Sequence, residues 1–312
     1  MKIGLMDIDG HNFPNLALMK LSAWFKNKGA AVEFVNHFKE YDVVFKSKVF
    51  TFTSDDTHYV KSEIIKYGGT GYNAFWNLQD HIEHTCPDYS LYNYPHALGF
   101  LTRGCIRKCT FCIVPHKEGW IKDHADIDEF LDGRKTAVLL DNNALASKHG
   151  LKQIEKIISL GIKVDFNQGL DARLIDDNIA KLLSKVKWLR PIRMACDSQS
   201  MIKPVESAVK LLRKHGATPC QYFVYMIING DINEALDRFY FLRNLKVDPF
   251  AQPLITDIDK PTKEQKKLAR YINSRQLRNI SWEEYKYRIT SPSTGNKTIT
   301  NETNKGKARS IY

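Results

Sequence analysis

The chain has 312 residues, of which 43% are hydrophobic and 26% charged, and its formal net charge is +11 at pH 7. These proportions are typical of globular proteins and favour neither a disordered chain nor a membrane protein. No run of about 18 apolar residues occurs, and acids stand within the first ten positions, so we expect no membrane span, no signal peptide and a cytoplasmic location.

Residues 1–94 are predicted to form a small Rossmann-like α/β module followed by a linker. Apolar residues recur at near-helical spacing from Leu16 to Phe25 and predict a helix that Gly29 ends. Apolar runs predict strands around this helix, at residues 2–9, 31–35, 42–52 and 63–69. The stretch 73–95 is rich in Asp, Asn, Tyr and Pro, and we interpret it as the linker.

The loop after the first predicted strand reads Asp9-Gly10-His11. This Asp-x-His order resembles the loop in which many cobalamin-binding Rossmann modules present an imidazole to cobalt, which makes His11 a candidate cobalamin ligand. The Gly that completes the motif in that family is replaced by Pro14. The alternative, which we prefer, is a polar turn at a helix start, in a module that has lost its cofactor.

Residues 95–260 alternate between strand-like and helix-like segments. Six apolar runs predict strands, at residues 96–104, 136–141, 163–168, 191–196, 221–228 and 248–254. Amphipathic segments between them predict helices, for example at residues 151–161, 176–186 and 204–216. Such alternation is typical of parallel sheets with right-handed crossovers, so we expect an incomplete (β/α)6 TIM-like barrel with its functional residues at the carboxyl ends of the strands.

Three of the six cysteines lie in a loop that follows the strand predicted at 96–104. Cys105, Cys109 and Cys112 have the spacing C-x3-C-x2-C, whereas the other cysteines are scattered, which indicates metal binding and not a disulfide framework. A structural zinc site needs a fourth ligand, for which the nearby candidate is His116. An iron–sulfur cube held by three thiolates keeps one iron open for a substrate or cofactor.

This loop, GFLTRGCIRKCTFC with Phe111 before the third cysteine, closely resembles the signature of the radical S-adenosylmethionine superfamily. The resemblance covers roughly residues 95–260. It implies a 4Fe-4S cluster on the three cysteines that reductively cleaves S-adenosylmethionine to a 5′-deoxyadenosyl radical acting on an unknown substrate. It also implies an electron donor such as flavodoxin or ferredoxin.

The sequence Cys-Ile-Val-Pro after the cluster motif is similar to that of the methylthiotransferases. Those enzymes carry three additional cysteines in an N-terminal domain. Here only Cys86 precedes the loop, which argues against that activity.

The resemblance also suggests which residues of the first strands hold the nucleoside. Phe111 occupies the position of an aromatic near the adenine. Asp141 and Asn143 follow the second strand, where family members often carry the Gly-Gly-Glu that binds the methionine amino group, and their oxygens are candidate acceptors for that ammonium. The glycines are missing here, and a plain turn that caps the next helix is the alternative.

Later strand ends supply further candidates. Gln168 is a candidate for a ribose hydroxyl, and Arg173 for the carboxylate of S-adenosylmethionine, although Asp171 and Arg173 would equally form a local salt bridge. Asp197 is a candidate for ribose or substrate, and Gln252 for the adenine or the substrate.

Residues 261–312 are predicted to form a basic helical extension and, from Ser291, a disordered tail. From Lys260 onward 13 Lys/Arg face 4 Asp/Glu, which suits either RNA or DNA binding or a solvated surface. Three aromatics near the end either stack on bases or pack against the barrel, namely Trp282, Tyr285 and Tyr287. Two alternative functions stay open: a cobalamin-dependent radical methyltransferase, and a zinc-containing nucleic-acid-binding protein.

Overall fold

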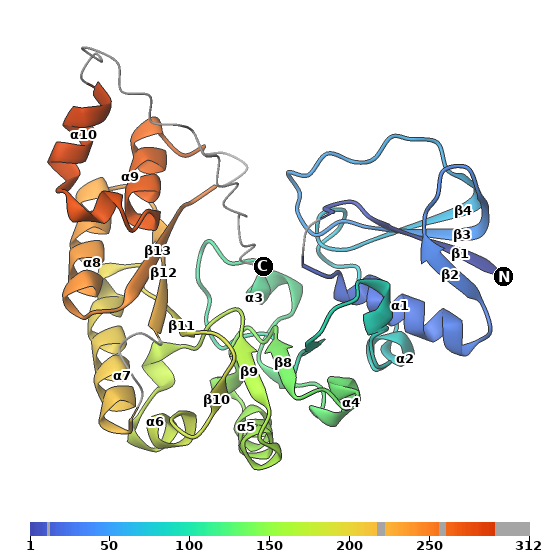
Figure 1. Cartoon of the computed structure of the whole chain (residues 1–312), viewed down its shortest axis with the longest axis horizontal. Coiled ribbons are helices and arrows are strands. Elements are labelled where there is room, and N and C mark those ends of the chain that lie inside the picture. The colour runs from blue at the N-terminus through green and yellow to red at the C-terminus, as the bar shows by residue number, and fades with distance from the viewer. Residues whose placement is uncertain (11–12, 217–221, 256–259, 291–312) are drawn as a thin grey trace. The chain divides into compact units, whose positions relative to one another are not determined.

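The computed structural model describes residues 1–10, 13–216, 222–255 and 260–290. His11 and the tail predicted from Ser291 lie outside the described residues. The chain divides into two compact units, the first formed by residues 1–167 and 185–190 and the second by residues 168–184 and those from 191 onward (Figure 1). The domain boundaries expected after residues 94 and 260 stay predictions.

The first unit begins with a four-stranded parallel sheet in the order β2-β1-β3-β4. Its strands are β1 (Lys2–Asp7), β2 (Ala31–Phe34), β3 (Glu40–Ser47) and β4 (Lys61–Gly68). Helix α1 (Leu16–Asn27) starts at Asn15, whose side chain accepts a hydrogen bond from the Leu18 N–H, and it packs Leu18 and Leu21 against one face of β1. The short helix α2 (Asp80–Glu83) follows β4. The predicted strand–helix–strand order is therefore confirmed.

Gly4 permits an unusually short crossover in this sheet. Strands β2 and β3 lie on opposite sides of β1, yet only residues 35–39 connect them. A Cβ at Gly4 would lie 2.7 Å from Val35 Cγ2 and 3.0 Å from Val44 Cγ2. The connection passes directly over β1 because Gly4 has no side chain there.

The remainder of the first unit holds a second parallel sheet, in the order β10-β9-β8-β5. Its strands are β5 (Ala97–Gly99), β8 (Thr136–Leu139), β9 (Lys163–Phe166) and β10 (Lys187–Trp188). A small antiparallel pair, β6 (Thr102–Arg103) with β7 (Lys122–Asp123), brackets the cysteine loop. The helices of this part are α3 (Val114–Lys117), α4 (Asp128–Leu131) and α5 (Lys148–Leu160).

The second unit contains a parallel sheet in the order β11-β12-β13, formed by β11 (Ile192–Ala195), β12 (Tyr222–Ile228) and β13 (Asp248–Pro253). An isolated parallel bridge joins Leu170 to Met194 of β11. The helices are α6 (Asp177–Leu183), α7 (Ile202–Lys214), α8 (Ile232–Asn244), α9 (Lys263–Asn273) and α10 (Trp282–Thr290). Each of the six predicted strands contains a strand of one of these two parallel sheets, although the one predicted at 96–104 also contains β6, which pairs antiparallel with β7. Closure into one incomplete barrel stays a prediction.

Helix α10 packs through its aromatic residues. Trp282 and Tyr285 are 3% and 4% exposed, and both rings contact Tyr271 of α9. Tyr287 is 72% exposed. Packing therefore accounts for two of the three aromatics considered for base stacking. In the described ranges, no helix is long and apolar enough to cross a membrane.

Candidate functional site

The three cysteines of the predicted cluster lie half-buried on one loop between β6 and β7. The backbone N–H of Arg107 donates to Cys105 Sγ over 3.3 Å. Burial raises the pKa of the Cys112 thiol, and the neighbouring Cys109 and Cys105 thiols act in the same direction. All three thiols therefore come from one short loop.

A zinc ion and an iron–sulfur cube place different demands on three thiolates. A tetrahedral zinc with Zn–S bonds of about 2.3 Å brings its sulfurs to about 3.8 Å from one another. In the described part of the chain, the three sulfurs of Cys105, Cys109 and Cys112 do not all lie within 4.8 Å of each other. In an iron–sulfur cube each thiolate binds a different iron, so the sulfurs stand farther apart. Thiolates are ligands of both zinc and iron–sulfur clusters, so the donor set of three cysteines is compatible with either group.

Gly104 shapes the entry to the loop. Its φ is +79°, and a Cβ there would lie 2.3 Å from the backbone oxygen of Trp120. The next residue, Cys105, donates its backbone N–H to the Gly119 oxygen over 3.2 Å. The two ends of the loop approach this closely only because position 104 lacks a side chain.

Glu118 ties the loop to its surroundings. Its Oε2 accepts hydrogen bonds from the Gly104 N–H over 2.8 Å and from Asn142 Nδ2 over 2.9 Å. Its Oε1 lies 2.9 Å from Arg103 Nη2, and both side chains are largely buried. Sequence reasoning missed Glu118, because one acid between Lys117 and Gly119 looks like an ordinary surface residue.

Asp141 is a fully buried carboxylate that anchors the strand leading into the loop. It accepts hydrogen bonds from the Leu101 N–H over 3.1 Å, the Thr102 N–H over 2.6 Å and Thr102 Oγ1 over 2.7 Å. Burial raises the pKa of Asp141, and these hydrogen bonds oppose the rise. Its oxygens are engaged by the protein itself, which gives it a positioning role that the sequence did not suggest.

Asn143 is the member of the Asp-Asn-Asn turn nearest the cysteines. It is 2% exposed, and its Nδ2 lies 3.5 Å from Cys105 Sγ. The structure therefore brings the carboxyl end of β8 and the cysteine loop together. Phe111 lies half-buried within the same loop. Whether either residue contacts S-adenosylmethionine stays a prediction at this point.

In the second unit, Asp197 and Gln252 lie on either side of the same strand. Asp197 Oδ1 accepts the Ile227 N–H of β12 over 2.9 Å, and Gln252 of β13 pairs with Ile227 in register. Burial raises the pKa of Asp197, against the Ile227 hydrogen bond and the charges of Arg238 and Arg173. The carboxyl ends of β11, β12 and β13 thus gather polar groups as the sequence predicted.

Arg173 forms the local salt bridge that was the alternative for this residue. Its Nε lies 2.7 Å from Asp171 Oδ1, and 36% of its side chain is exposed. Gln168 follows β9 and is half-buried. Because its Nε is paired with Asp171, Arg173 would bind a ligand through its two Nη nitrogens.

Arg238 is a buried cation that the sequence did not single out. It is 1% exposed, and it donates to the backbone oxygens of Cys196 over 2.6 Å and Ile227 over 2.9 Å. Glu234, one helical turn earlier on α8, lies 2.7 Å from it. This pair fixes the ends of β11 and β12, and with them the backbone next to Asp197.

The loop that carries His11 is described up to Gly10. Asp9 accepts hydrogen bonds from Thr53 Oγ1 over 2.7 Å and from the Phe50 N–H over 3.4 Å. Asp9 therefore holds the loop that follows β3.

No family model matches the chain, and no curated protein matches it. Two solved structures of the cobalamin-dependent S-adenosylmethionine radical enzyme OxsB are similar to it. The form with aqua-cobalamin and S-adenosylmethionine bound is 13% identical with a TM-score of 0.53, and the match covers 89% of this chain and 56% of that one. The form with aqua-cobalamin bound is 14% identical with a TM-score of 0.55, covering 88% and 56%. The chain thus spans little more than half of the OxsB chain, and the likeness shows an α/β fold similar to that of OxsB over this part.

Proposed function

We propose that the protein is a radical S-adenosylmethionine enzyme. The observation that carries the proposal is a three-thiol loop, fixed at its base by Gly104, Glu118 and Asp141, within a fold similar to that of such enzymes. Three protein ligands and one open iron are the arrangement that this chemistry requires.

Cys105, Cys109 and Cys112 would hold a 4Fe-4S cluster. When bound and reduced, the cluster supplies one electron that cleaves S-adenosylmethionine into methionine and a 5′-deoxyadenosyl radical, which removes a hydrogen atom from the substrate. The protein binds, orients and excludes water, since the cofactors carry the chemistry.

The residues around the loop have separate tasks in this proposal. Asn143 is next to the first cysteine, so its side chain would meet the amino group of the methionine part. Asp141, proposed for the same ammonium from its position in the sequence, acts mainly by fixing Leu101 and Thr102 below the loop. Phe111, on the cysteine loop itself, would face the adenine.

The second unit also carries residues for which we propose roles. Gln168 would bond the ribose, Arg173 would pair with the carboxylate of S-adenosylmethionine, and Asp197 and Gln252 would meet ribose, adenine or substrate. The location of Asp197 and Gln252 on either side of the end of β12 supports their assignment. It requires residues 95–260 to close as an incomplete six-stranded barrel, with residues 1–94 as a separate module and 261–312 as a basic extension. The electron donor, the cytoplasmic location and an RNA or DNA partner stay predictions.

The experiment is an anaerobic reconstitution of the full chain with iron and sulfide, followed by addition of a reductant and S-adenosylmethionine. We expect 5′-deoxyadenosine in wild-type protein and none in the Cys105→Ala, Cys109→Ala and Cys112→Ala variants. Cys86→Ala is the matched control, because Cys86 lies outside the loop. Equal product from wild type and the three loop variants would refute the proposal.

A second candidate is a cobalamin-dependent radical methyltransferase, favoured by the similarity of both OxsB structures over nearly the whole chain. It requires corrinoid binding that is lost in His11→Ala. The third candidate is a zinc-containing nucleic-acid-binding protein, and zinc without sulfide in the purified protein would favour it.

A further inference from the structure

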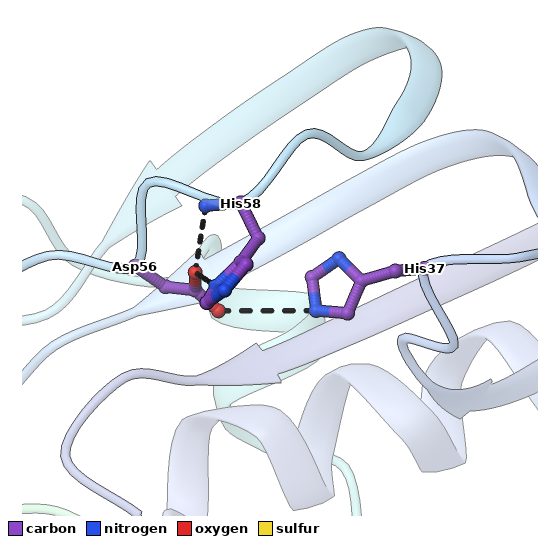
Figure 2. Close-up of side chains that lie close together, drawn as sticks. All are labelled: His37, Asp56 and His58. Atoms are coloured by element: carbon purple, nitrogen blue, oxygen red, sulfur yellow. Dashed lines mark hydrogen bonds and ion pairs between the residues drawn. The ribbon is translucent and has the colours of Figure 1, made fainter.

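Three potential metal ligands gather at one edge of the N-terminal sheet. His37, Asp56 and His58 each offer one ligand atom, and these atoms all lie within 4.8 Å of one another. His58 Nδ1 is 2.6 Å from Asp56 Oδ1, and His37 Nε2 is 4.0 Å from Asp56 Oδ2. Figure 2 shows the two imidazole rings approaching the same carboxylate.

The sheet register explains why His37 meets Asp56 and His58, which lie 19 and 21 positions later in the chain. His37 lies in the crossover just before β3, and His58 lies just before β4. The first residues of these strands, Glu40 and Lys61, are paired in register. The cluster therefore lies at the end of the sheet where the parallel strands begin. The Asp9 loop follows the carboxyl end of β1, so the cluster is separate from the cobalamin-like loop.

The side chains are already oriented for binding. His37 Nδ1 lies 3.1 Å from the Tyr59 backbone oxygen, and a carbonyl can only accept, so this nitrogen carries the hydrogen. The lone pair is then on Nε2, which faces Asp56. A second hydrogen bond of this kind, from the ring nitrogen that does not bind metal to a carbonyl, is typical of metal-ligating histidines. The His58 backbone N–H fixes Asp56 Oδ1 over 2.9 Å.

The charges around the cluster leave its carboxylate available. Lys46, the nearest lysine, donates to the backbone oxygen of Asp56 over 2.8 Å and lies 3.4 Å from the Asp55 carboxylate. Lys39, on the crossover with His37, is paired with Glu33 at 2.8 Å. Among the described residues, the Asp56 side chain pairs with His37 and His58 and with no Lys or Arg.

We propose that His37, Asp56 and His58 bind a divalent transition-metal ion, zinc above all, with the remaining coordination positions open to water. Two imidazoles and one carboxylate are ligands that zinc prefers. In a tetrahedron, bonds of about 2.0–2.2 Å place neighbouring ligand atoms about 3.3–3.6 Å apart. His37 Nε2 and Asp56 Oδ2, now 4.0 Å apart, therefore need to approach by roughly half an ångström. Because 81% of the His58 side chain is exposed, its ring is free to exchange the hydrogen bond to Asp56 for the metal.

The test is a calorimetric titration of the full chain with Zn²⁺. Cys105, Cys109 and Cys112 are changed to Ala in every sample, so that they do not compete for the ion. We expect one saturable site per chain, weakened by about tenfold or more in His37→Ala, Asp56→Asn and His58→Ala. His81→Ala, another exposed histidine of the same region, is the matched control and should bind as the parent does.

Circular dichroism of each variant establishes that it is folded, and Co²⁺ provides a second measurement. In the parent, we expect weak visible bands of nitrogen- and oxygen-bound cobalt that disappear in His58→Ala. The proposal is overturned if the parent shows no saturable site, if all three ligand variants bind Zn²⁺ with the affinity of the parent, or if His81→Ala weakens binding as much as they do. The readout needs no S-adenosylmethionine, so its failure is independent of the proposed enzymatic function.

Discussion

Replacing Gly104 by Ala should prevent cluster assembly, and the structure allows the effect to be estimated. A side chain at φ +79° costs about 1–2 kcal/mol. The added Cβ would also lie 2.3 Å from the Trp120 oxygen, where ordinary contacts begin at 3.4 Å, so the backbone must move by roughly 1 Å. That movement breaks the hydrogen bond from Cys105 to Gly119, which contributes about 1 kcal/mol. We expect a total destabilisation of about 3–5 kcal/mol.

Gly119→Ala is the matched control in the same loop. Its φ is +75°, but an added Cβ would meet nothing within 4 Å, so this variant pays only the backbone strain of about 1–2 kcal/mol. The assays are urea unfolding of the cluster-free protein and iron and sulfide content after anaerobic reconstitution. We expect Gly104→Ala to lose most of its cluster and Gly119→Ala to keep it. Equal, small losses in both variants would show that the close approach at Trp120 does not shape the loop.

Three further predictions concern stability, and urea unfolding measures each. In Asp141→Asn, the donors that bond to the carboxylate in wild type would face an amide group, so we expect the free energy of unfolding to fall by about 2–4 kcal/mol. An unchanged urea midpoint would contradict the anchoring role. Burial raises the pKa of Glu83, but bonds from His124 and Lys20 outweigh it and hold that pKa at about 2. The stability that this low pKa provides is present above pH 4.5 and is lost as the pH falls towards 2. The free energy of unfolding of wild type should therefore exceed that of Glu83→Gln by about 2 kcal/mol at pH 7, part of the gain being offset because burial lowers the pKa of Lys20. The two values should converge in acid. Trp282→Ala should cost about 3–5 kcal/mol and the exposed Tyr287→Ala about 0.5 kcal/mol or less, and the reverse order would contradict the packing of α10.

Hydrophobic periodicity was sufficient to predict the parallel strands and the main helices. The run TAVL is buried on both faces, which is typical of parallel sheets covered by helices, whereas YFVYMII alternates between buried and half-buried residues. Strand ends were less exact. The strand predicted up to Phe52 ends at Ser47, because Asp9 binds the residues after it as a loop.

The cysteine loop was predictable because its ligands are close in sequence. The residues that support it were not, because their partners are distant. Asp141 accepts hydrogen bonds from Leu101 and Thr102, about forty positions earlier. Arg238 donates a hydrogen bond to the backbone oxygen of Cys196, 42 positions earlier, just after β11. Charged residues on a helix or loop resemble surface residues until the fold shows that they are buried.

The histidine–aspartate cluster illustrates the same limit. His37 and His58 belong to different connections, and neither stands in a recognisable metal-binding spacing. Only the register between β3 and β4 brings their connections to one edge of the sheet. The departure of Asp141-Asn142-Asn143 from Gly-Gly-Glu is also understandable in physical terms, since Asp141 is needed below the loop and Asn142 binds Glu118.

The most direct test of the central claim is the electron paramagnetic resonance spectrum of the reduced, reconstituted protein before and after addition of S-adenosylmethionine. If three thiolates leave one iron open, the cluster signal should change when the sulfonium compound is added, and protein with all three loop cysteines replaced should give no signal. A cluster spectrum that S-adenosylmethionine leaves unchanged would contradict the account.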